Sequence, residues 1–205
     1  MSASDLFGDD TNDGDIVFRD IITLALSGFV SMVVMILPHL NPPAKASAIE
    51  GIAAPGNVIV EIRWPDELDT DVDLWVQAPG DVPVGYSNKG GKYFNLLRDD
   101  LGRVGDSTNL NYEIAFSRGL PPGEYTANIQ LYRNPGGQPV PVTMAISLKP
   151  TVQASARPVL TTNLTLRREG EELTGFRFTL DQDGKLVPGS AHNLFKPLRS
   201  ARNKG

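Results

Sequence analysis

Cysteine is absent from this chain of 205 residues, and only two histidines, His39 and His192, are present. The lack of cysteine excludes disulfide bonds, thiolate zinc sites and cysteine nucleophiles. The histidines form no His-x-x-x-His pair, and the chain has neither a Gly-x-Ser-x-Gly motif nor a glycine-rich phosphate loop. We therefore expect a protein that is not an enzyme.

An excess of positive charge is also lacking, because 24 acidic residues against 19 basic ones give a formal net charge of −5. That balance excludes the basic footprint of a nucleic-acid-binding protein. Long apolar runs are equally rare, and the one that reaches membrane length extends over the 22 residues from Ile16 to Leu37. As a helix it would span about 33 Å, enough for a hydrocarbon core of about 30 Å. The sequence predicts a single transmembrane helix over residues 16–38.

Asp20 is the candidate functional residue of this helix, because ionisable groups inside a membrane cost several kcal/mol unless they are paired or used. Its neighbour Arg19 can extend its long stem back to the headgroups, but the aspartate side chain is too short to do so. The alternative is that Asp20 marks the helix start, where a carboxylate suits the helix dipole and can pair with Arg19.

A stripe of hydroxyl side chains follows Asp20 along the helix. At 100° per residue, Thr23, Ser27 and Ser31 lie within about 60° of Asp20. Small hydroxyl residues are common where membrane helices pack together. The stripe therefore predicts a side of the helix that faces protein, and it leaves open whether that side is also an ion path.

The segment from Phe18 to Leu24, followed by an apolar run and Pro38, resembles the single span of the MotB/ExbD/TolR stator subunits. In that family an aspartate near the cytoplasmic end of the span carries H⁺ or Na⁺. Two copies sit inside a ring of MotA/ExbB/TolQ-type subunits, and ion flow drives rotation or force. The chain departs from the family at Arg19, where a neutral residue is usual. It also lacks an OmpA-like peptidoglycan-binding pattern and the small periplasmic fold of ExbD and TolR.

The resemblance implies a stator-like subunit of an ion-driven motor in a bacterial inner membrane, with Asp20 as the ion-carrying carboxylate. It also implies a dimer of this chain, a pentameric ring of a multi-span partner subunit, a cytoplasmic N-terminus and a periplasmic C-terminal domain that contacts an envelope component. The alternative is a membrane-anchored binding or scaffold module in which the helix is a passive tether.

A cleaved signal peptide is a further alternative, since Ala46-Ser47-Ala48 resembles a peptidase site. The region before the apolar run is acidic instead of basic, and the run is long for a signal peptide, so we expect an uncleaved anchor. The predicted organisation is an acidic cytoplasmic tail, the helix, a Pro/Ala/Gly linker, a β-sandwich and a basic, solvated C-terminal tail (1–15, 16–38, 39–56, 57–188 and 189–205).

The region after the linker is predicted to be mainly β, because short β-rich runs alternate with clusters of Gly, Pro, Asn and Asp. In Tyr125–Leu131 the odd positions are expected to face the core. The number and spacing of the runs favour an antiparallel β-sandwich. The eight runs are Val58–Trp64, Val72–Gln77, Lys92–Leu97, Asn111–Phe116, Glu124–Tyr132, Val142–Leu148, Val159–Arg167 and Leu173–Leu180.

Asp71–Gly80 and Leu120–Tyr125 resemble the D-x-D-L-x-V…P and P-G-x-Y signatures of small periplasmic β-sandwich modules. This resemblance implies the fold and an interaction role, without a specific partner. The large aromatic residues are expected in the core, and any that is exposed would be a candidate for binding a glycan or a partner. They are Trp64, Trp75, Tyr86, Tyr93 and Phe94.

Acidic residues crowd into the segment 66–73, and Asp99-Asp100 follow later in the chain. On a strand, Asp69, Asp71 and Asp73 would point to the same side and repel one another unless a cation neutralises them. Ca²⁺, which takes six to eight oxygen ligands, would suit such a group, although the EF-hand pattern is absent. The alternative is a solvated turn in which the aspartates cap backbone amides.

Overall fold

The computed structural model describes residues 11–40, 55–102, 110–151 and 154–199, and the side chains of its N-terminal helix from Ile16 to Ile36. The predicted peptidase-like site at Ala46-Ser47-Ala48 and most of the predicted linker lie outside these residues. The chain divides into two compact units, one containing the helix and the other containing all the strands.

Helix α1 runs over the 30 residues Thr11–Leu40. Its described part extends to Leu40, two residues beyond Pro38. It begins at Thr11 and not at the apolar Ile16, since aspartates in a first helical turn are stabilised by the helix dipole. The last residues of the predicted acidic tail are therefore helical.

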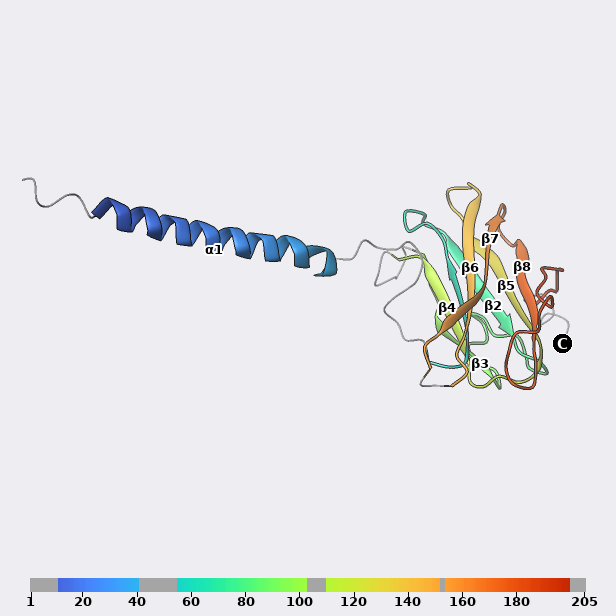
Figure 1. Cartoon of the computed structure of the whole chain (residues 1–205). Coiled ribbons are helices and arrows are strands. Elements are labelled where there is room, and N and C mark those ends of the chain that lie inside the picture. The colour runs from blue at the N-terminus through green and yellow to red at the C-terminus, as the bar shows by residue number, and fades with distance from the viewer. Residues whose placement is uncertain (1–10, 41–54, 103–109, 152–153, 200–205) are drawn as a thin grey trace, which may run out of the picture. The chain divides into compact units, whose positions relative to one another are not determined.

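The second unit consists of eight antiparallel strands in two sheets (Figure 1). Each predicted run coincides with a strand to within two residues at either end, so the predicted antiparallel β-sandwich is confirmed. The five-stranded sheet has the order β3-β4-β1-β6-β7, and the three-stranded sheet has the order β2-β5-β8. The strands are β1 (Val58–Arg63), β2 (Asp71–Gln77), β3 (Phe94–Arg98), β4 (Tyr112–Ser117), β5 (Gly123–Arg133), β6 (Val140–Leu148), β7 (Arg157–Leu166) and β8 (Glu172–Leu180).

The core lies between the two sheets and follows the two-residue period of the strands. In β5 the odd positions Tyr125, Ala127, Ile129 and Leu131 belong to the main hydrophobic cluster, as predicted. Tyr125 also anchors the turn that precedes β5, because its hydroxyl donates a hydrogen bond of 2.8 Å to the carbonyl oxygen of Pro121. This is the tyrosine corner found in many sandwiches, and it gives the segment Leu120–Tyr125 a structural role.

The polar residues of β5 are buried as well, because a C-terminal segment covers the outer face of the three-stranded sheet. Leu198 is 1% exposed, and its backbone N–H donates to Glu172. Asn128 donates to the carbonyl oxygen of Lys196, and the backbone N–H of Lys196 donates to Thr174. The predicted solvated tail is therefore wrong for residues 196–199, because the buried polar face of the sheet requires these partners.

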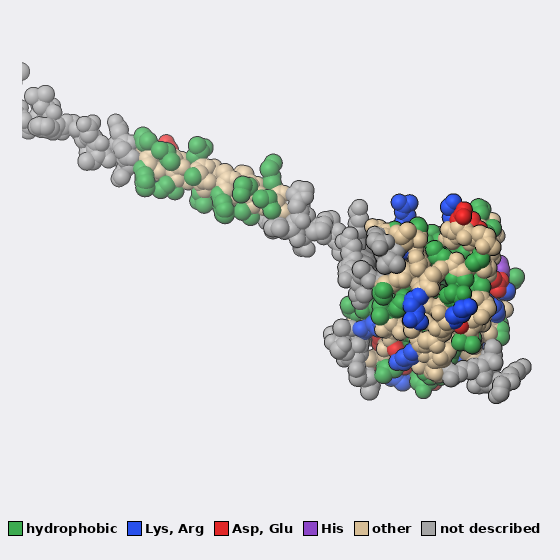
Figure 2. All heavy atoms as spheres, turned by 90° about the horizontal axis from the view of Figure 1, so that it is seen from below, with side chains coloured by type: hydrophobic (Ala, Val, Ile, Leu, Met, Phe, Trp, Pro, Cys, Tyr) green, Lys and Arg blue, Asp and Glu red, His purple; other side chains and the backbone are tan. Residues whose placement is uncertain are grey.

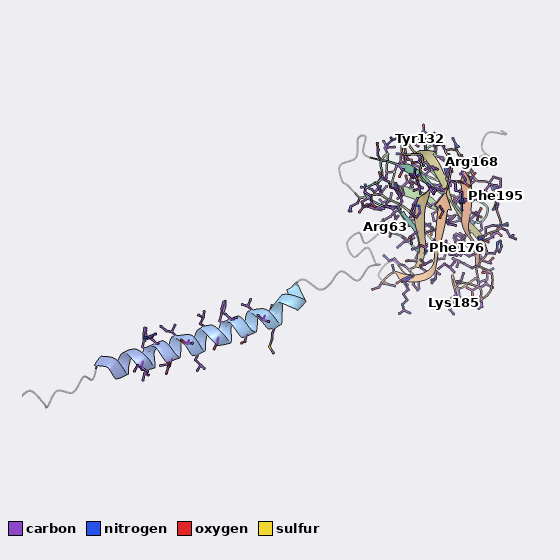
Figure 3. All side chains as sticks on the ribbon, turned by 90° about the horizontal axis from the view of Figure 1, so that it is seen from above. Arg63, Tyr132, Arg168, Phe176, Lys185 and Phe195 are labelled. Atoms are coloured by element: carbon purple, nitrogen blue, oxygen red, sulfur yellow. The ribbon has the colours of Figure 1, made fainter. Side chains whose placement is uncertain are left out.

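Three of the five large aromatic residues are confirmed as core residues, namely Trp64, Trp75 and Phe94. Tyr86 and Tyr93 are half-buried. The exposed aromatic side chains of the described domain are instead Tyr132 and Phe195, which Figure 3 labels. Neither was among the predicted candidates for a binding surface.

Candidate functional site

The apolar part of α1 is exposed along its entire described length. The stretch Ile16–Ile36 is long and apolar enough to cross a membrane, and none of it is buried in the structure. Figure 2 shows hydrophobic side chains along the whole of this stretch, whereas on the visible face of the β-domain they are interspersed with Lys and Arg. A membrane anchor and a signal sequence both meet these criteria.

Asp20 lies in the second turn of the apolar stretch and is exposed. Among the residues that the structure describes, no donor contacts its carboxylate. It lies four positions after Ile16, which places it about 6 Å along the helix axis from the start of the stretch. The carboxylate therefore lies near the N-terminal end of the apolar stretch.

The hydroxyls of the predicted polar stripe bond within their own helix. Thr23 Oγ1 donates to the carbonyl oxygen of Arg19 at 2.7 Å, and Ser27 Oγ donates to that of Leu24 at 2.9 Å. Ser31 lies one turn further along and is exposed. Since bonds of this kind satisfy a hydroxyl without a neighbour, Thr23 and Ser27 do not require a partner helix.

A second candidate site lies in the β-domain, where three carboxylates come together from separate parts of the sequence. Asp73 on β2, Asp99 after β3 and Glu113 on β4 each offer an oxygen within 4.8 Å of the others. Asp73 is 3% exposed and Glu113 is 1% exposed. This buried group could hold a metal ion.

Glu113 connects the two sheets at this point. Its Oε2 accepts a hydrogen bond of 2.7 Å from the backbone N–H of Leu74 on β2. Its Oε1 accepts one of 3.1 Å from the backbone N–H of Asp100. Strand β2 pairs with β5 along its other edge, so Glu113 caps β2 on the edge that has no neighbouring strand in its sheet. Each carboxylate oxygen keeps a lone pair for a further ligand.

Several acceptor oxygens in and beside this group have no donor among the described residues. They include Asp71 Oδ1, Asp73 Oδ2 and Asp99 Oδ1. The other oxygen of Asp99 contacts Lys89 Nζ at 2.8 Å. A buried acceptor without a partner loses the hydrogen bonds it makes to water in the unfolded chain, so these oxygens call for a proton, an ordered water or a cation.

The structure does not assemble the predicted group of Asp69, Asp71 and Asp73. Asp71 and Asp73 point to the same side of β2, as predicted, and both are buried. Asp69 precedes the strand and pairs with Arg133, whose Nη2 lies 2.7 Å from Asp69 Oδ1. Arg133 therefore neutralises Asp69, and Asp99 and Glu113 complete the carboxylate group in its place.

Asp100 does not belong to the carboxylate group, because both of its carboxylate oxygens accept hydrogen bonds from nearby residues. Its Oδ2 accepts from Arg98 Nη2 at 3.1 Å and from the backbone N–H of Tyr112 at 3.2 Å. Its Oδ1 accepts from the backbone N–H of Gly102. Asp100 therefore shapes the loop that presents Asp99.

Burial and mutual repulsion raise the pKa values of these carboxyl groups. Burial, and then the negative charges of Asp71 and Asp99, raise the pKa of Asp73 to about 8, against a smaller opposing effect of Arg199. Burial and the charge of Asp99 raise the pKa of Asp71 to about 6. The pKa of Glu113 is raised well above its ordinary value by burial and by Asp73, although its two backbone hydrogen bonds oppose the shift.

These shifts predict that the metal-free domain loses stability as pH rises. Asp73 ionises near pH 4 in the unfolded chain but near pH 8 in the folded one, so the unfolded state gains stability between these values. In chelator, the melting temperature should fall by about 5 °C or more between pH 5 and pH 8. Thermal unfolding of the wild type and of Asp73→Asn checks this, since the variant should show a smaller fall. An equal fall in both would exclude Asp73 as the cause.

The sequence does not single out Glu113. Its neighbours Tyr112 and Ile114 are large and apolar, which suggests that they face the core and that Glu113 faces solvent. In the structure both faces of β4 are covered. Tyr112 and Ile114 form a separate small cluster with Ile59 on the outer face, and the guanidinium groups of Arg63 and Arg98 lie 5.4 Å and 4.2 Å from the Tyr112 ring centroid. The signal that could have identified Glu113 is Ala115, which lies two residues further on the same face of β4 and belongs to the main core.

Comparisons with known proteins identify no relative. No family model, no curated protein and no solved structure matches the chain significantly.

Proposed function

We propose that the chain is a single-span membrane protein that serves as a stator-like subunit of an ion-driven motor. Asp20 is the residue that carries H⁺ or Na⁺ in this proposal. The observation behind it is an exposed carboxylate that contacts no donor among the described residues, next to Arg19 in the mainly apolar stretch Ile16–Ile36, none of which is buried. Such a placement is costly in lipid and is typical of a group that is used.

The proposal assigns the rest of the chain accordingly. The N-terminus lies in the cytoplasm and the β-sandwich lies in the periplasm, where it grips an envelope component. Two copies of α1 occupy a ring of a multi-span subunit of the MotA/ExbB/TolQ type, and Thr23, Ser27 and Ser31 line the contact with that ring. The amino-acid resemblance around Asp20 supports this arrangement.

The test is to purify the intact protein from its native membrane in mild detergent, and to identify and image what remains bound. We expect two copies of this chain inside a pentameric ring of a multi-span protein. The intact mass should also include the residues before Ile16, which a cleaved signal peptide would remove. A single copy without a membrane partner, or a mature chain that begins after residue 48, would contradict the motor proposal.

The second candidate function is a membrane-tethered binding or scaffold module. It is favoured by the hydroxyls of Thr23 and Ser27, which bond to carbonyl oxygens of their own helix and need no partner. In that case, an unrelated apolar helix should replace residues 16–37 without affecting the binding partners of the β-domain. In a motor, the same replacement would release the ring.

A further inference from the structure

We propose that Asp73, Asp99 and Glu113 bind a hard divalent cation, Ca²⁺ above all, which clamps the two sheets of the sandwich together at the free edge of β2. This site is independent of the motor proposal, because it lies entirely within the β-domain. It shares Asp73 with the acidic segment 66–73, for which the sequence predicted either a calcium site or a solvated turn, and takes its other two ligands from elsewhere in the chain.

The spacing of the three carboxylates fits one ion. Their ligand oxygens all lie within 4.8 Å of one another. Oxygens bound to Ca²⁺ at about 2.4 Å can be at most about 4.8 Å apart. Buried carboxylates this close repel one another in a medium of low dielectric constant unless a proton, a basic group or a bound ion offsets their charges.

Unpartnered atoms give a second and independent indication. Asp73 is 97% buried, and its Oδ2 contacts no donor among the described residues. Gln130, the cross-strand partner of Asp73 on β5, is 1% exposed and has an unpartnered Oε1 as well. While Asp73 is ionised, neither oxygen can donate a hydrogen bond to the other, and a cation bound at Asp73 would supply the positive charge that its carboxylate lacks.

The balance of charge points to a divalent ion. Lys89 Nζ contacts Asp99 Oδ2 at 2.8 Å, so three ionised carboxylates and this lysine carry a formal charge of −2. Asp71 adds negative potential from the same side of β2, and Arg199 opposes it. A divalent cation neutralises the group without any change in the surrounding chain.

The type of ligand selects a hard ion. The group consists only of oxygen donors, whereas zinc and other softer metals favour nitrogen and sulfur. Its members come from three separate segments and do not form a single ligand loop. Ca²⁺ accepts irregular oxygen coordination, while Mg²⁺ demands a near-ideal octahedron and dehydrates reluctantly. Ca²⁺ is therefore the best candidate.

The positions of the ligands define what the ion would do. Asp73 belongs to the three-stranded sheet, whereas Glu113 belongs to the five-stranded sheet and Asp99 to the connection after β3. An ion bound to all three joins the sheets at the same place where Glu113 caps β2. The expected result of binding is a more stable domain, since a ligand of the folded state alone raises stability.

The test uses the full chain in detergent after removal of metal ions with chelator. Ca²⁺ titration calorimetry should show one site per chain, and saturating Ca²⁺ should raise the melting temperature by about 5–10 °C. Tb³⁺, a luminescent ion with the same preference for oxygen, provides a direct probe. Trp75 lies two residues from Asp73 on the same side of β2 and should sensitise Tb³⁺ emission, which Ca²⁺ should then displace.

Matched variants locate the site. Asp73→Asn keeps the shape of the side chain and should lower Ca²⁺ affinity roughly tenfold or more, with loss of the Tb³⁺ signal. Asp183→Asn is the control, because Asp183 is exposed and pairs with Lys185. Figure 3 shows Lys185 at the opposite end of the domain from Tyr132. The proposal is overturned if millimolar Ca²⁺ changes neither heat nor melting temperature, or if Asp73→Asn binds Ca²⁺ as tightly as the wild type.

Discussion

Replacement of Asp20 by Asn should abolish ion flow through the proposed motor complex, while the complex still assembles. The complex, purified from its membrane and placed in vesicles, is expected to take up protons or Na⁺ under an imposed potential. In the Asp20→Asn variant this uptake should fall to the level of empty vesicles.

The physical reason is that an ion-carrying carboxylate must exchange between a charged and a neutral form. Asparagine has nearly the same size and can occupy the same place on α1, but it does not bind a proton and has no charge to attract Na⁺. Asp20→Glu keeps the carboxylate on a longer side chain, so it should retain part of the flow.

Two controls separate this effect from damage to the helix. Asp13→Asn removes a carboxylate that precedes the apolar stretch of α1, and it should leave ion flow unchanged. Recovery of each variant with the partner subunit reports assembly. If Asp20→Asn conducts at the rate of the wild type, the motor proposal fails and the tethered module becomes the better account.

Replacement of Glu113 by Ala should destabilise the β-domain by about 3 kcal/mol, the largest effect that we expect from a single polar residue in this domain. The change leaves the N–H groups of Leu74 and Asp100 buried without an acceptor. It also opens a cavity between β2 and β4. Relief of the buried carboxyl group offsets only part of this loss. The melting temperature in chelator should fall by about 10 °C.

Glu113→Gln distinguishes the hydrogen bonds from the volume of the side chain. Glutamine fills the same space and can accept one of the two N–H groups, so its effect on the free energy of unfolding should be about half as large. Asp183→Ala, on the exposed turn, should change that energy by less than about 0.5 kcal/mol. A Glu113→Ala domain that melts with the wild type would show that the cap of β2 contributes nothing to stability.

The fold could be predicted from the sequence because local residue patterns specify its strands and turns. The alternation of Tyr125, Ala127, Ile129 and Leu131 identifies both a strand and its buried face, and turns such as Asp181–Gly184 mark the strand ends. In that turn Asp181 accepts from the N–H groups of Asp183 and Lys185, and Gly184 adopts a φ of 72° that favours glycine.

Only part of the carboxylate group could be predicted from the sequence, since the group depends on contacts between segments that are distant along the chain. The pattern of Asp71 and Asp73 indicated their common direction, but not that Arg133 would neutralise Asp69 from the end of another strand. The approach of Asp99 and Glu113 to Asp73 results from the packing of one sheet against the other. Burial of the outer face of the three-stranded sheet likewise depends on where the C-terminal segment lies.

The position of β1 has a mechanical consequence. Strand β1 is the first strand after α1 in the sequence, and it is the central strand of the five-stranded sheet, paired with β4 on one side and β6 on the other. Because hydrogen bonds between antiparallel strands run perpendicular to them, tension along β1 loads both ladders in shear at once and does not peel away an edge strand. A tether attached in this way can transmit a pulling force without unravelling the domain at its point of attachment.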